Sequence, residues 1–465
     1  MEHGMADDTL PGFVAATAAG MGIPGVAVGV WADGREAYAC HGVTSVENPL
    51  PVDRDTLFLL GSVTKTYTAT ALMRLAAEGR VELEAPVRRY VPELRLAEER
   101  AAAAITVRHL LTHTSGLDWD LLVDAGEGDD ALASYVARLA ELKLIAPPGA
   151  RASYSQAGYN LAGRIVEQVT GLTFERAVAA LVSEPVGLAH SHFARDDVMT
   201  RRFAVGHNPG PDGTLAVARP WRHWRSGNPG GGIASSAADQ LRWARFHLGD
   251  GRGEGGAGIL PAGTLQRMQA PAVALRGSAL GDAIGLCWFL RDVDGVRTVG
   301  HGGSSNGQFA ELLIVPERSF AVVSLANAGP NGIPFNRAVV RWALRTYLGV
   351  TDRDPEPLPY DGARAREIAG AYENDAMTLV IRTDGARLTL EVDIKPAIRA
   401  AAATELPPGY PPAAIGLLPG DGDEYLLTGG GMRGQRGFFT RDERGAVVGV
   451  DLAGRLFARV PVATG

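Results

Sequence analysis

The stretch LFLLGSVTKTYTATAL, residues 57–72, decides how this chain is interpreted, because it places a serine and a lysine three residues apart. Ser62 opens a run of apolar residues near helical spacing that continues to Glu78 and ends at Gly79, a residue typical of helix C-termini. At this spacing Ser62 and Lys65 lie on one helix face, within hydrogen-bonding reach. The start of such a helix also offers the backbone N–H of Ser62 to a developing oxyanion.

A lysine can activate a neighbouring serine only if its amine can accept a proton. The ordinary lysine pKa of about 10.4 makes the amine a poor base at neutral pH. Burial beside polar groups would lower the pKa of Lys65 by several units, because loss of solvent disfavours the charged ammonium. The pair therefore predicts Ser62 as a nucleophile that Lys65 activates. The alternative is a helix N-cap serine with an exposed lysine, since S-x-x-K also occurs by chance.

Strands and helices surround this pair in an order that indicates a mixed fold. Two alternating segments, Val26 to Trp31 and Glu36 to His41, are separated by Ala32-Asp33-Gly34-Arg35 and predict a β-hairpin. From about residue 81 to residue 270 the pattern is mostly helical, interrupted by long polar loops. The helical segments include Thr106 to Thr112, Gly158 to Thr170 and Ala237 to Leu248.

A second strand region follows, and it predicts an antiparallel meander that ends in a helix near Asn336 to Leu348. Its candidate strands are Leu286 to Leu290, Arg297 to His301, Phe309 to Val315 and Phe320 to Leu325. Strands at both ends of a region with helices between them imply one sheet, built from about residues 10–60 and 280–350. A helical lobe of about residues 80–275 would be inserted, and a cleft between the lobes is where a site is expected.

The C-terminal hundred residues predict a separate, all-β domain after a proline-rich linker. The linker, residues 351–363, contains Asp354-Pro-Glu-Pro-Leu-Pro359, which excludes regular structure. Residues 364–465 are expected to form a small barrel or sandwich, and no catalytic constellation is visible in it. The strand candidates are Leu379 to Ile381, Leu388 to Val392, Glu424 to Thr428, Gly437 to Thr440, Val447 to Val450 and Arg455 to Val460.

Bulk properties narrow the class of protein. The 465 residues are 46% hydrophobic and 21% charged, which suits a globular protein of two or three domains. The net charge of −7 argues against a nucleic-acid partner. The sequence has no apolar run of membrane-spanning length and no secretory signal, so a cytoplasmic location is expected. Cys40 and Cys287 lie in apolar runs and are expected to be buried free thiols.

The surroundings of Ser62 and Lys65 resemble the serine β-lactamase and penicillin-binding-protein superfamily. The similar branch contains class C β-lactamases, D-alanyl-D-alanine carboxypeptidases, D-aminopeptidases and esterases, and the resemblance covers roughly residues 10–350. The family's first motif matches Ser62 and Lys65, and the segment ITVRHLLTHTSGL at Ile105 to Leu117 is also similar. The resemblance implies an α+β, β-lactamase/transpeptidase-like fold in residues 1–350, and a serine nucleophile that needs no cofactor.

The family's second motif, Tyr-x-Asn, falls on Tyr154-Ser155-Gln156. The resemblance implies that Tyr154 shares proton transfer with Lys65, as a tyrosinate or as a hydroxyl relay. Gln156 stands where the family usually has asparagine; it keeps the same donor and acceptor groups but is one methylene longer. We expect Gln156 to orient Lys65 or to bind a substrate carbonyl.

The third motif, Lys-Thr-Gly in most β-lactamases, corresponds to His301-Gly302-Gly303. The glycines let a strand edge approach the substrate, and the N–H of Ser304 would be the second oxyanion donor beside that of Ser62. His301 is mostly neutral at pH 7, so a permanent cation for a substrate carboxylate is missing. The resemblance therefore favours esterases, D-aminopeptidases and peptide cyclases, and it predicts weak β-lactam hydrolysis at best.

Three further patterns are interpreted as decoys. Residues 303–307 fit G-x-S-x-G, but a strand follows them instead of the helix that a nucleophile elbow needs. Residues 251–256 fit G-x-G-x-x-G but follow a helix, so they are read as a flexible loop. The pairs His109/His113 and His190/His192 lack a third ligand, and no metal site is expected.

These observations predict a two-step acyl transfer through an acyl-Ser62 intermediate, with Lys65 and Tyr154 as the acid–base pair. Hydrolysis of esters or D-amino-acid amides or peptides is the leading interpretation, with a small molecule or short peptide as substrate. One alternative is a stand-alone peptide cyclase of nonribosomal biosynthesis, which uses an amine instead of water. Another is a non-catalytic, penicillin-recognising or scaffold protein, which would be labelled slowly without turnover.

Overall fold

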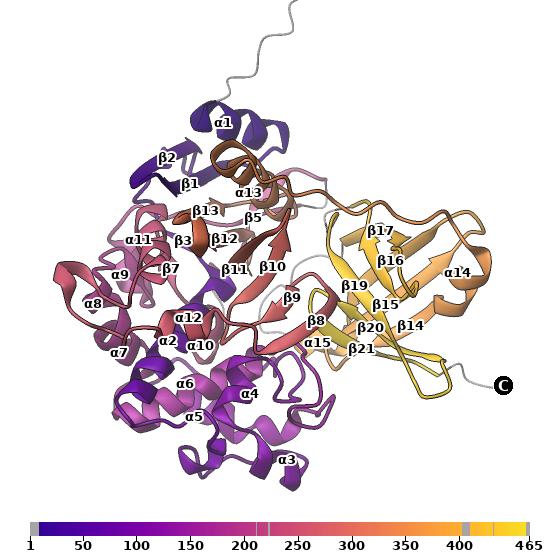
Figure 1. Cartoon of the computed structure of the whole chain (residues 1–465), viewed down its shortest axis with the longest axis horizontal. Helices are drawn as coiled ribbons and strands as arrows, with labels where there is room; N and C mark the ends of the chain where they lie inside the picture. Colours follow the sequence, from indigo (N-terminus) through magenta and orange to yellow (C-terminus); the bar gives the residue numbers. More distant parts are fainter. Residues whose placement is uncertain (1–8, 211, 222–223, 402–409, 431, 462–465) are drawn as a thin grey trace, which may run out of the picture.

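An eight-stranded antiparallel sheet lies at the centre of the larger part of the computed structural model, which describes residues 9–461 except 211, 222–223, 402–409 and 431 (Figure 1). The strand order is β2-β1-β13-β12-β11-β10-β9-β8, so the N-terminal hairpin pairs with the last strand of the later meander. The strands are β1 Gly25–Ala32, β2 Arg35–Gly42, β8 Val273–Ser278, β9 Gly281–Ile284, β10 Phe289–Val293, β11 Val296–Ser305, β12 Gln308–Val315 and β13 Phe320–Ala326.

Helices cover both faces of this sheet. α1 (Leu10–Gly20) and α13 (Gly332–Leu348) pack on one face, and α11 (Ala237–Leu248) packs on the other. A strand that is buried on both faces should be apolar throughout rather than alternating. The sequence of β13, FAVVSLA, is buried at every position and is apolar except at Ser324, whose Oγ donates to Asn336 Oδ1 at 2.7 Å. The sheet is therefore the middle layer of three.

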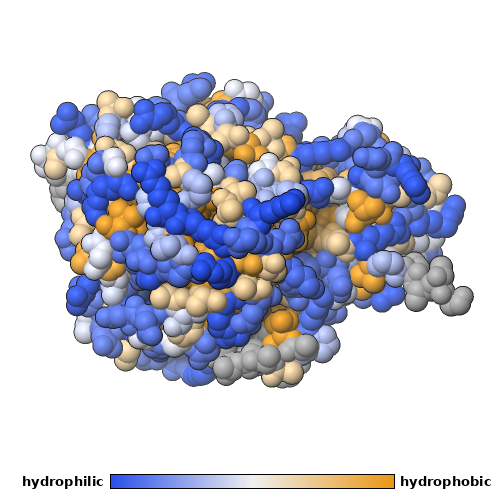
Figure 2. All heavy atoms as spheres, turned by 90° about the horizontal axis from the view of Figure 1, so that it is seen from below, coloured by the Kyte–Doolittle hydropathy of each residue, from blue (hydrophilic) through white to orange (hydrophobic). Residues whose placement is uncertain are grey.

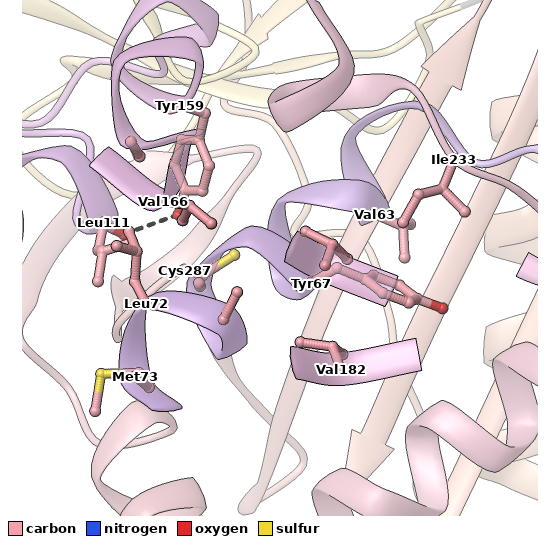
Figure 3. Packing of buried hydrophobic residues seen from close by; sticks show 14 of the residues in the cluster. Val63, Tyr67, Leu72, Met73, Leu111, Tyr159, Val166, Val182, Ile233 and Cys287 are labelled. Atoms are coloured by element: carbon pink, nitrogen blue, oxygen red, sulfur yellow. Dashed lines mark hydrogen bonds between the residues drawn. The ribbon is translucent and has the colours of Figure 1, made fainter. Parts of the chain in front are cut away.

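A helical lobe is built around α2 (Thr64–Ala77), which is buried along most of its length. Figure 3 shows Tyr67 and Leu72 of α2 among buried side chains from other elements, and the Tyr159 hydroxyl donating a hydrogen bond to the Leu111 carbonyl at 3.2 Å. Because α2 is covered on all sides, groups on its first turn are removed from water. The other helices of this lobe are α3 Glu99–Ala104, α4 Val107–Leu111, α5 Ala131–Ala137, α6 Gln156–Thr170 and α7 Phe174–Val178.

Short elements connect the sheet to this lobe. A three-stranded sheet of order β3-β7-β4 leads the chain into the turn that carries Ser62, and the Leu60 N–H donates to the Ile233 carbonyl at 2.9 Å. The short elements are β3 Phe58–Leu59, β4 Ser191–His192, β5 His207–Pro209, β6 Leu215–Val217, β7 Ala234–Ser235, α8 Glu184–Val186, α9 Arg195–Met199, α10 Asn228–Gly231 and α12 Thr264–Met268.

The C-terminal part is a closed eight-stranded barrel, which stands beside β8–β10 in Figure 1 and forms the smaller lobe in Figure 2. Pairing of β14 with β21 closes the barrel, so that no strand edge is left open. Tyr372, Tyr425 and Phe439 fill its interior. Its elements are α14 Gly362–Ile368, β14 Gly370–Glu373, β15 Met377–Thr383, β16 Leu388–Ile394, α15 Pro396–Ala401, β17 Tyr410–Leu417, β18 Glu424–Leu427, β19 Arg436–Arg441, β20 Val447–Leu452 and β21 Arg455–Arg459.

Ion pairs hold the start of the linker against the sheet. Asp352 accepts from Arg291 at 2.7 Å and from Arg341 at 3.1 Å, and Asp354 accepts from Arg341 at 2.7 Å and also pairs with Arg337. Burial alone would raise the pKa of the Asp352 carboxyl, but the two arginines hold it below its ordinary value. The chain therefore leaves the first part of the molecule along a fixed path rather than as a free tether.

The sequence predicted the fold class correctly, including the antiparallel sheet, the helical lobe and the barrel, but several element assignments are wrong. The predicted strand Leu286 to Leu290 begins only at Phe289, because Cys287 adopts a φ of 82° and its N–H donates to the Leu111 carbonyl. An apolar run without alternation fits a buried turn as well as a strand. Strands β8 and β9 were not predicted, and β8 begins within the range given to the helical lobe; β14 and β17 were also missed.

Strand β11 passes directly behind η1 (Gly61–Val63), the 3₁₀ turn that carries Ser62. A Cβ atom on Gly303 would lie 2.0 Å from the Leu60 carbonyl oxygen and 2.7 Å from the Ser62 nitrogen. A Cβ on Gly61, which has a φ of 51°, would lie 2.3 Å from the Ser304 carbonyl oxygen. Glycine at both positions is what lets these two segments touch.

Replacing Gly303 by alanine should therefore force the strand away from the turn. We expect Gly303→Ala to lower the free energy of unfolding by about 3 kcal/mol, as other overpacking changes do. Gly302→Ala is the matched control, because a Cβ there meets only the flexible end of Glu311, at 2.9 Å; it should cost less than about 1 kcal/mol. Urea unfolding of both variants measures the difference, and equal losses would contradict this packing.

Candidate active site

Ser62 lies in the turn η1, immediately before α2, rather than inside the α-helix. Lys65, on the first turn of α2, donates hydrogen bonds from Nζ to Ser62 Oγ at 3.3 Å, Gln156 Oε1 at 2.6 Å and the Gly230 carbonyl at 2.7 Å. The side chain of Lys65 is completely buried. The predicted pair is thus brought together, and the lysine is held by three acceptors.

Burial changes the ionisation of Lys65. Loss of solvent lowers its pKa to about 7, while the neighbouring Cys287 and Asp120 oppose the shift. At neutral pH a substantial fraction of the amine is therefore uncharged and carries a lone pair. An uncharged Nζ at hydrogen-bonding distance from Ser62 Oγ can accept the hydroxyl proton, which an ordinary lysine cannot do at this pH.

Tyr154 lies against the same pair. The Lys65 Nζ is 4.8 Å from the centre of the Tyr154 ring, and the ring is buried. Burial raises the pKa of the Tyr154 hydroxyl, and the neighbouring Ser62 hydroxyl and Arg455 guanidinium only partly oppose this shift. Tyr154 is therefore a neutral phenol at neutral pH, which suits a hydroxyl relay better than a tyrosinate.

The backbone around Tyr154 is held by the helix cap that follows it. Ser155 is the N-cap of α6: its Oγ accepts from the Gly158 N–H and donates to the Asp118 carbonyl at 2.9 Å. The Ser155 N–H donates to His113 Nδ1 at 3.1 Å, and the His113 ring lies 4.4 Å from the Tyr154 ring. Burial keeps the pKa of His113 well below its ordinary value, so this histidine is a neutral support.

Gln156 is the first residue of α6 and serves as a partner of Lys65. Its Nε2 donates to Asn160 Oδ1 and to the Gly227 carbonyl, each at 3.2 Å, so both amide hydrogens are used within the protein. This geometry agrees with the prediction that Gln156 orients Lys65. To donate a hydrogen bond to a substrate, Nε2 would first have to release Asn160 or Gly227. The longer side chain fits because Gly230 has no Cβ, which would lie 2.0 Å from Gln156 Nε2.

His301 on β11 faces the same cluster but carries no charge. Its ring is buried, with centroids 4.6 Å from Phe289 and 6.3 Å from Tyr154. Burial lowers its pKa to about 3, and Nδ1 contacts the Gly302 carbonyl at 2.7 Å. The sequence-based expectation of a neutral group at this position agrees with this environment.

The remaining predicted residues of β11 divide between its two faces. Gly303 lies against the Ser62 turn, and the Ser304 nitrogen would be 2.6 Å from a Cβ on Gly61. The two amides expected to bind the oxyanion, those of Ser62 and Ser304, thus belong to segments in direct contact. Gly302 faces Glu311 on β12 instead, on the side away from Ser62.

The barrel also reaches this site, although no catalytic constellation is visible in its own sequence. The Gly454 carbonyl accepts from the Tyr154 N–H at 2.8 Å, and the Leu456 N–H donates to Ser153 Oγ at 3.3 Å. Between them, the Arg455 guanidinium lies 5.3 Å from the centre of the Tyr154 ring. No sequence signal marks Arg455, because it is about 300 residues from Tyr154 and lies in an ordinary strand.

The patterns interpreted as decoys lie in ordinary structural elements. Residues 303–307 are the end of β11 and the turn into β12, not a strand–turn–helix. His109 Nδ1 accepts from the Thr106 N–H as part of a helix cap. Within the described residues, no three side chains of metal-binding type come together, and no helix is long and apolar enough to cross a membrane. Among the same residues Cys287 is a buried free thiol and Cys40 a half-buried one.

Comparison with known proteins agrees with this geometry. The family model "Beta-lactamase" matches residues 13–344. Penicillin-binding protein 4 of Amycolatopsis lactamdurans is 34% identical over 362 residues, covering 76% of this chain and 94% of that protein. Esterase EstB of Burkholderia gladioli is 35% identical over 236 residues, covering 43% of this chain and 59% of the esterase.

Among solved structures, that of SurE has the same overall fold. It aligns with a TM-score of 0.73 and 24% identity over 97% of this chain and 98% of SurE, so the alignment includes the barrel. The length of the family match and the extent of the similarity to penicillin-binding protein 4 settle the family. The chain belongs to the beta-lactamase family, whose members related to this chain include penicillin-binding proteins and esterases.

Proposed function

We propose that this protein is a serine hydrolase that cleaves ester or amide bonds through an acyl-Ser62 intermediate. The observation that carries the proposal is the completely buried Lys65 amine, with a pKa of about 7, at 3.3 Å from Ser62 Oγ. A lysine kept as an exposed surface charge would have neither property. Tyr154 and Gln156, at the positions of the family's second motif, and His301, at that of the third, support the same conclusion.

In the proposed reaction the uncharged Lys65 amine takes the proton of Ser62 as Oγ attacks the carbonyl carbon. The carbonyl π electrons move to oxygen, and the oxyanion accepts hydrogen bonds from the Ser62 and Ser304 amides. As the bond to the leaving group breaks, that group receives a proton from the Tyr154 hydroxyl, which is replaced by one from Lys65. Water then attacks the acyl-enzyme by the same steps in reverse.

The electrostatics of β11 favour esters or D-amino-acid amides over β-lactams. The family's lysine would place a permanent cation on β11, where His301 is neutral because its pKa is about 3. A β-lactam carboxylate would find no charge at this position. We therefore propose that β-lactam turnover is weak or absent.

A second candidate acceptor is an amine, which would make the protein a peptide cyclase. SurE, one of the fold neighbours that span both domains, has also been solved "with D-Leu", an amino acid that carries both an amine and a carboxylate. Supplying a p-nitrophenyl ester and a thioester-activated linear peptide separates the candidates, since cyclisation gives a product one water lighter than the hydrolysed peptide. Slow Ser62 labelling without turnover of either substrate would favour a non-catalytic binder instead.

Ser62→Ala should abolish both p-nitrophenyl ester hydrolysis and labelling by a fluorophosphonate probe, because Ser62 Oγ is the hydroxyl at hydrogen-bonding distance from the Lys65 amine. Lys65→Ala should lower kcat/KM by about a hundredfold or more, the usual loss for an acid–base group. Lys143→Ala, at an exposed lysine paired with Asp375, is the matched control and should not change the rate. Persistent labelling of the Ser62→Ala protein, checked by intact mass, would overturn the nucleophile assignment.

The pH profile tests the ionisation of Lys65. Because only the uncharged amine accepts the Ser62 proton, kcat/KM should rise as pH increases through about 7 and then level off. Asp120 raises the pKa of Lys65, so Asp120→Asn should move this rise to lower pH. Asp124→Asn, on the exposed part of the same loop, should leave it in place. A profile that is flat from pH 5 to 9 would contradict the role of Lys65.

A further inference from the structure

The Arg455 guanidinium is fixed by its neighbours in the β20–β21 hairpin. Gly454, in the turn, has a φ of 74°, and a Cβ there would lie 2.2 Å from the Leu280 side chain. The Gly454 carbonyl binds the Tyr154 N–H and the Leu456 N–H binds Ser153, so both neighbours of Arg455 are tied to the chain that carries Tyr154. The side chain therefore extends toward the site from a rigid base.

Two aromatic rings receive this side chain. The guanidinium carbon lies 5.0 Å from the centre of the Trp119 ring and 5.3 Å from that of Tyr154. Trp119 is itself held at the start of α6, because its carbonyl accepts from the Gln156 N–H at 2.6 Å. A cation–π contact of this kind orients a guanidinium while leaving the N–H donors in the guanidinium's own plane free.

Those donors have no acceptor in the described part of the chain. Arg455 makes no ion pair or hydrogen bond there, and its Nε is buried without a partner. Asp451 is the acidic residue nearest in the hairpin, but burial raises its pKa to about 8, so it is uncharged at neutral pH. Asp118 accepts from the backbone of Trp119 and Asp375 instead. Asp118 and Asp120 attract the guanidinium without a hydrogen bond to it, so its buried Nε stays unpaired, which is costly; an incoming anion would supply the missing partner.

We propose that Arg455 binds a carboxylate of the substrate, so that the barrel supplies the cation that β11 lacks. The inference rests on the proposed function, since it assigns the substrate class of the same site. The carboxylate could belong to the leaving group, as in the C-terminal residue of a peptide, or to the acyl group. Either way, the preferred substrates are open-chain esters or amides that carry a free carboxylate close to the scissile carbonyl, whereas a β-lactam carboxylate directed at β11 would still meet the neutral His301.

Two matched ester pairs test this assignment and separate its two sources. For the leaving group, 3-acetoxy-4-nitrobenzoate is compared with its methyl ester; for the acyl group, mono-p-nitrophenyl glutarate is compared with its methyl ester. Wild-type protein should prefer the carboxylate member of at least one pair by about tenfold or more. Arg455→Met should remove that preference by raising KM about ten- to hundredfold, the usual value of a charge-assisted hydrogen bond. Arg455→Lys should retain part of it.

The controls distinguish binding from folding and from chemistry. Arg444→Met, at an exposed turn of the barrel, should behave as wild type. Turnover of the methyl esters reports the chemistry of Ser62. If they are turned over as well as the matching carboxylates, the role of Arg455 is overturned and the Ser62 assignment stands. If Arg455→Met lowers kcat/KM equally for both members of a pair, Arg455 has a structural role, and carboxylate binding by Arg455 is overturned. If no ester is turned over, isothermal titration of the same pairs into Ser62→Ala and Ser62→Ala/Arg455→Met protein gives the comparison as Kd.

Discussion

The removal of the Lys65 amine from water is the constraint on which the rest of this structure depends. Because α2 is enclosed by the helical lobe and the sheet, its first turn holds an ionisable group in a dry environment. The three acceptors around Nζ, which are Ser62, Gln156 and Gly230, fix the amine in position, and burial brings its pKa to about 7. An ordinary surface lysine, charged at this pH, could not take a proton from serine.

The helical lobe and the barrel both contact Tyr154, the residue that completes the proposed proton path. Tyr154 is held from the helical lobe by Ser155 and His113, and from the barrel by Gly454. The barrel is therefore not a tethered appendage, and the ion pairs along the linker fix the start of the path that leads to it. Through Arg455, which lies 5.3 Å from the centre of the Tyr154 ring, a chain whose third motif lacks a cation can still present one beside the site.

Much of the site could be predicted from the sequence, since its motifs are local. Ser62 and Lys65 share one helical turn, and Tyr154 and His301 precede or lie in recognisable elements. The sequence left open whether Gln156 orients Lys65 or binds a substrate carbonyl, because the space for its longer side chain at Gly230 depends on a contact between residues 74 positions apart. The contribution of Arg455 was missed because it comes from tertiary packing of a separate domain. Similarly, Leu286 to Trp288 were read as a strand because an apolar run does not distinguish a buried turn from a strand.

The central claim, that burial brings the Lys65 amine to a pKa near 7, is open to a direct measurement because the chain contains only three lysines. A protein labelled with 13C at lysine Cε should give three signals in an NMR titration, with Lys65→Met assigning one of them. The Lys65 signal should titrate near pH 7. The signal of Lys143, whose pKa is raised by pairing with Asp375, should titrate above its ordinary range. A Lys65 signal that titrates near pH 10 would contradict the assignment of Lys65 as the base.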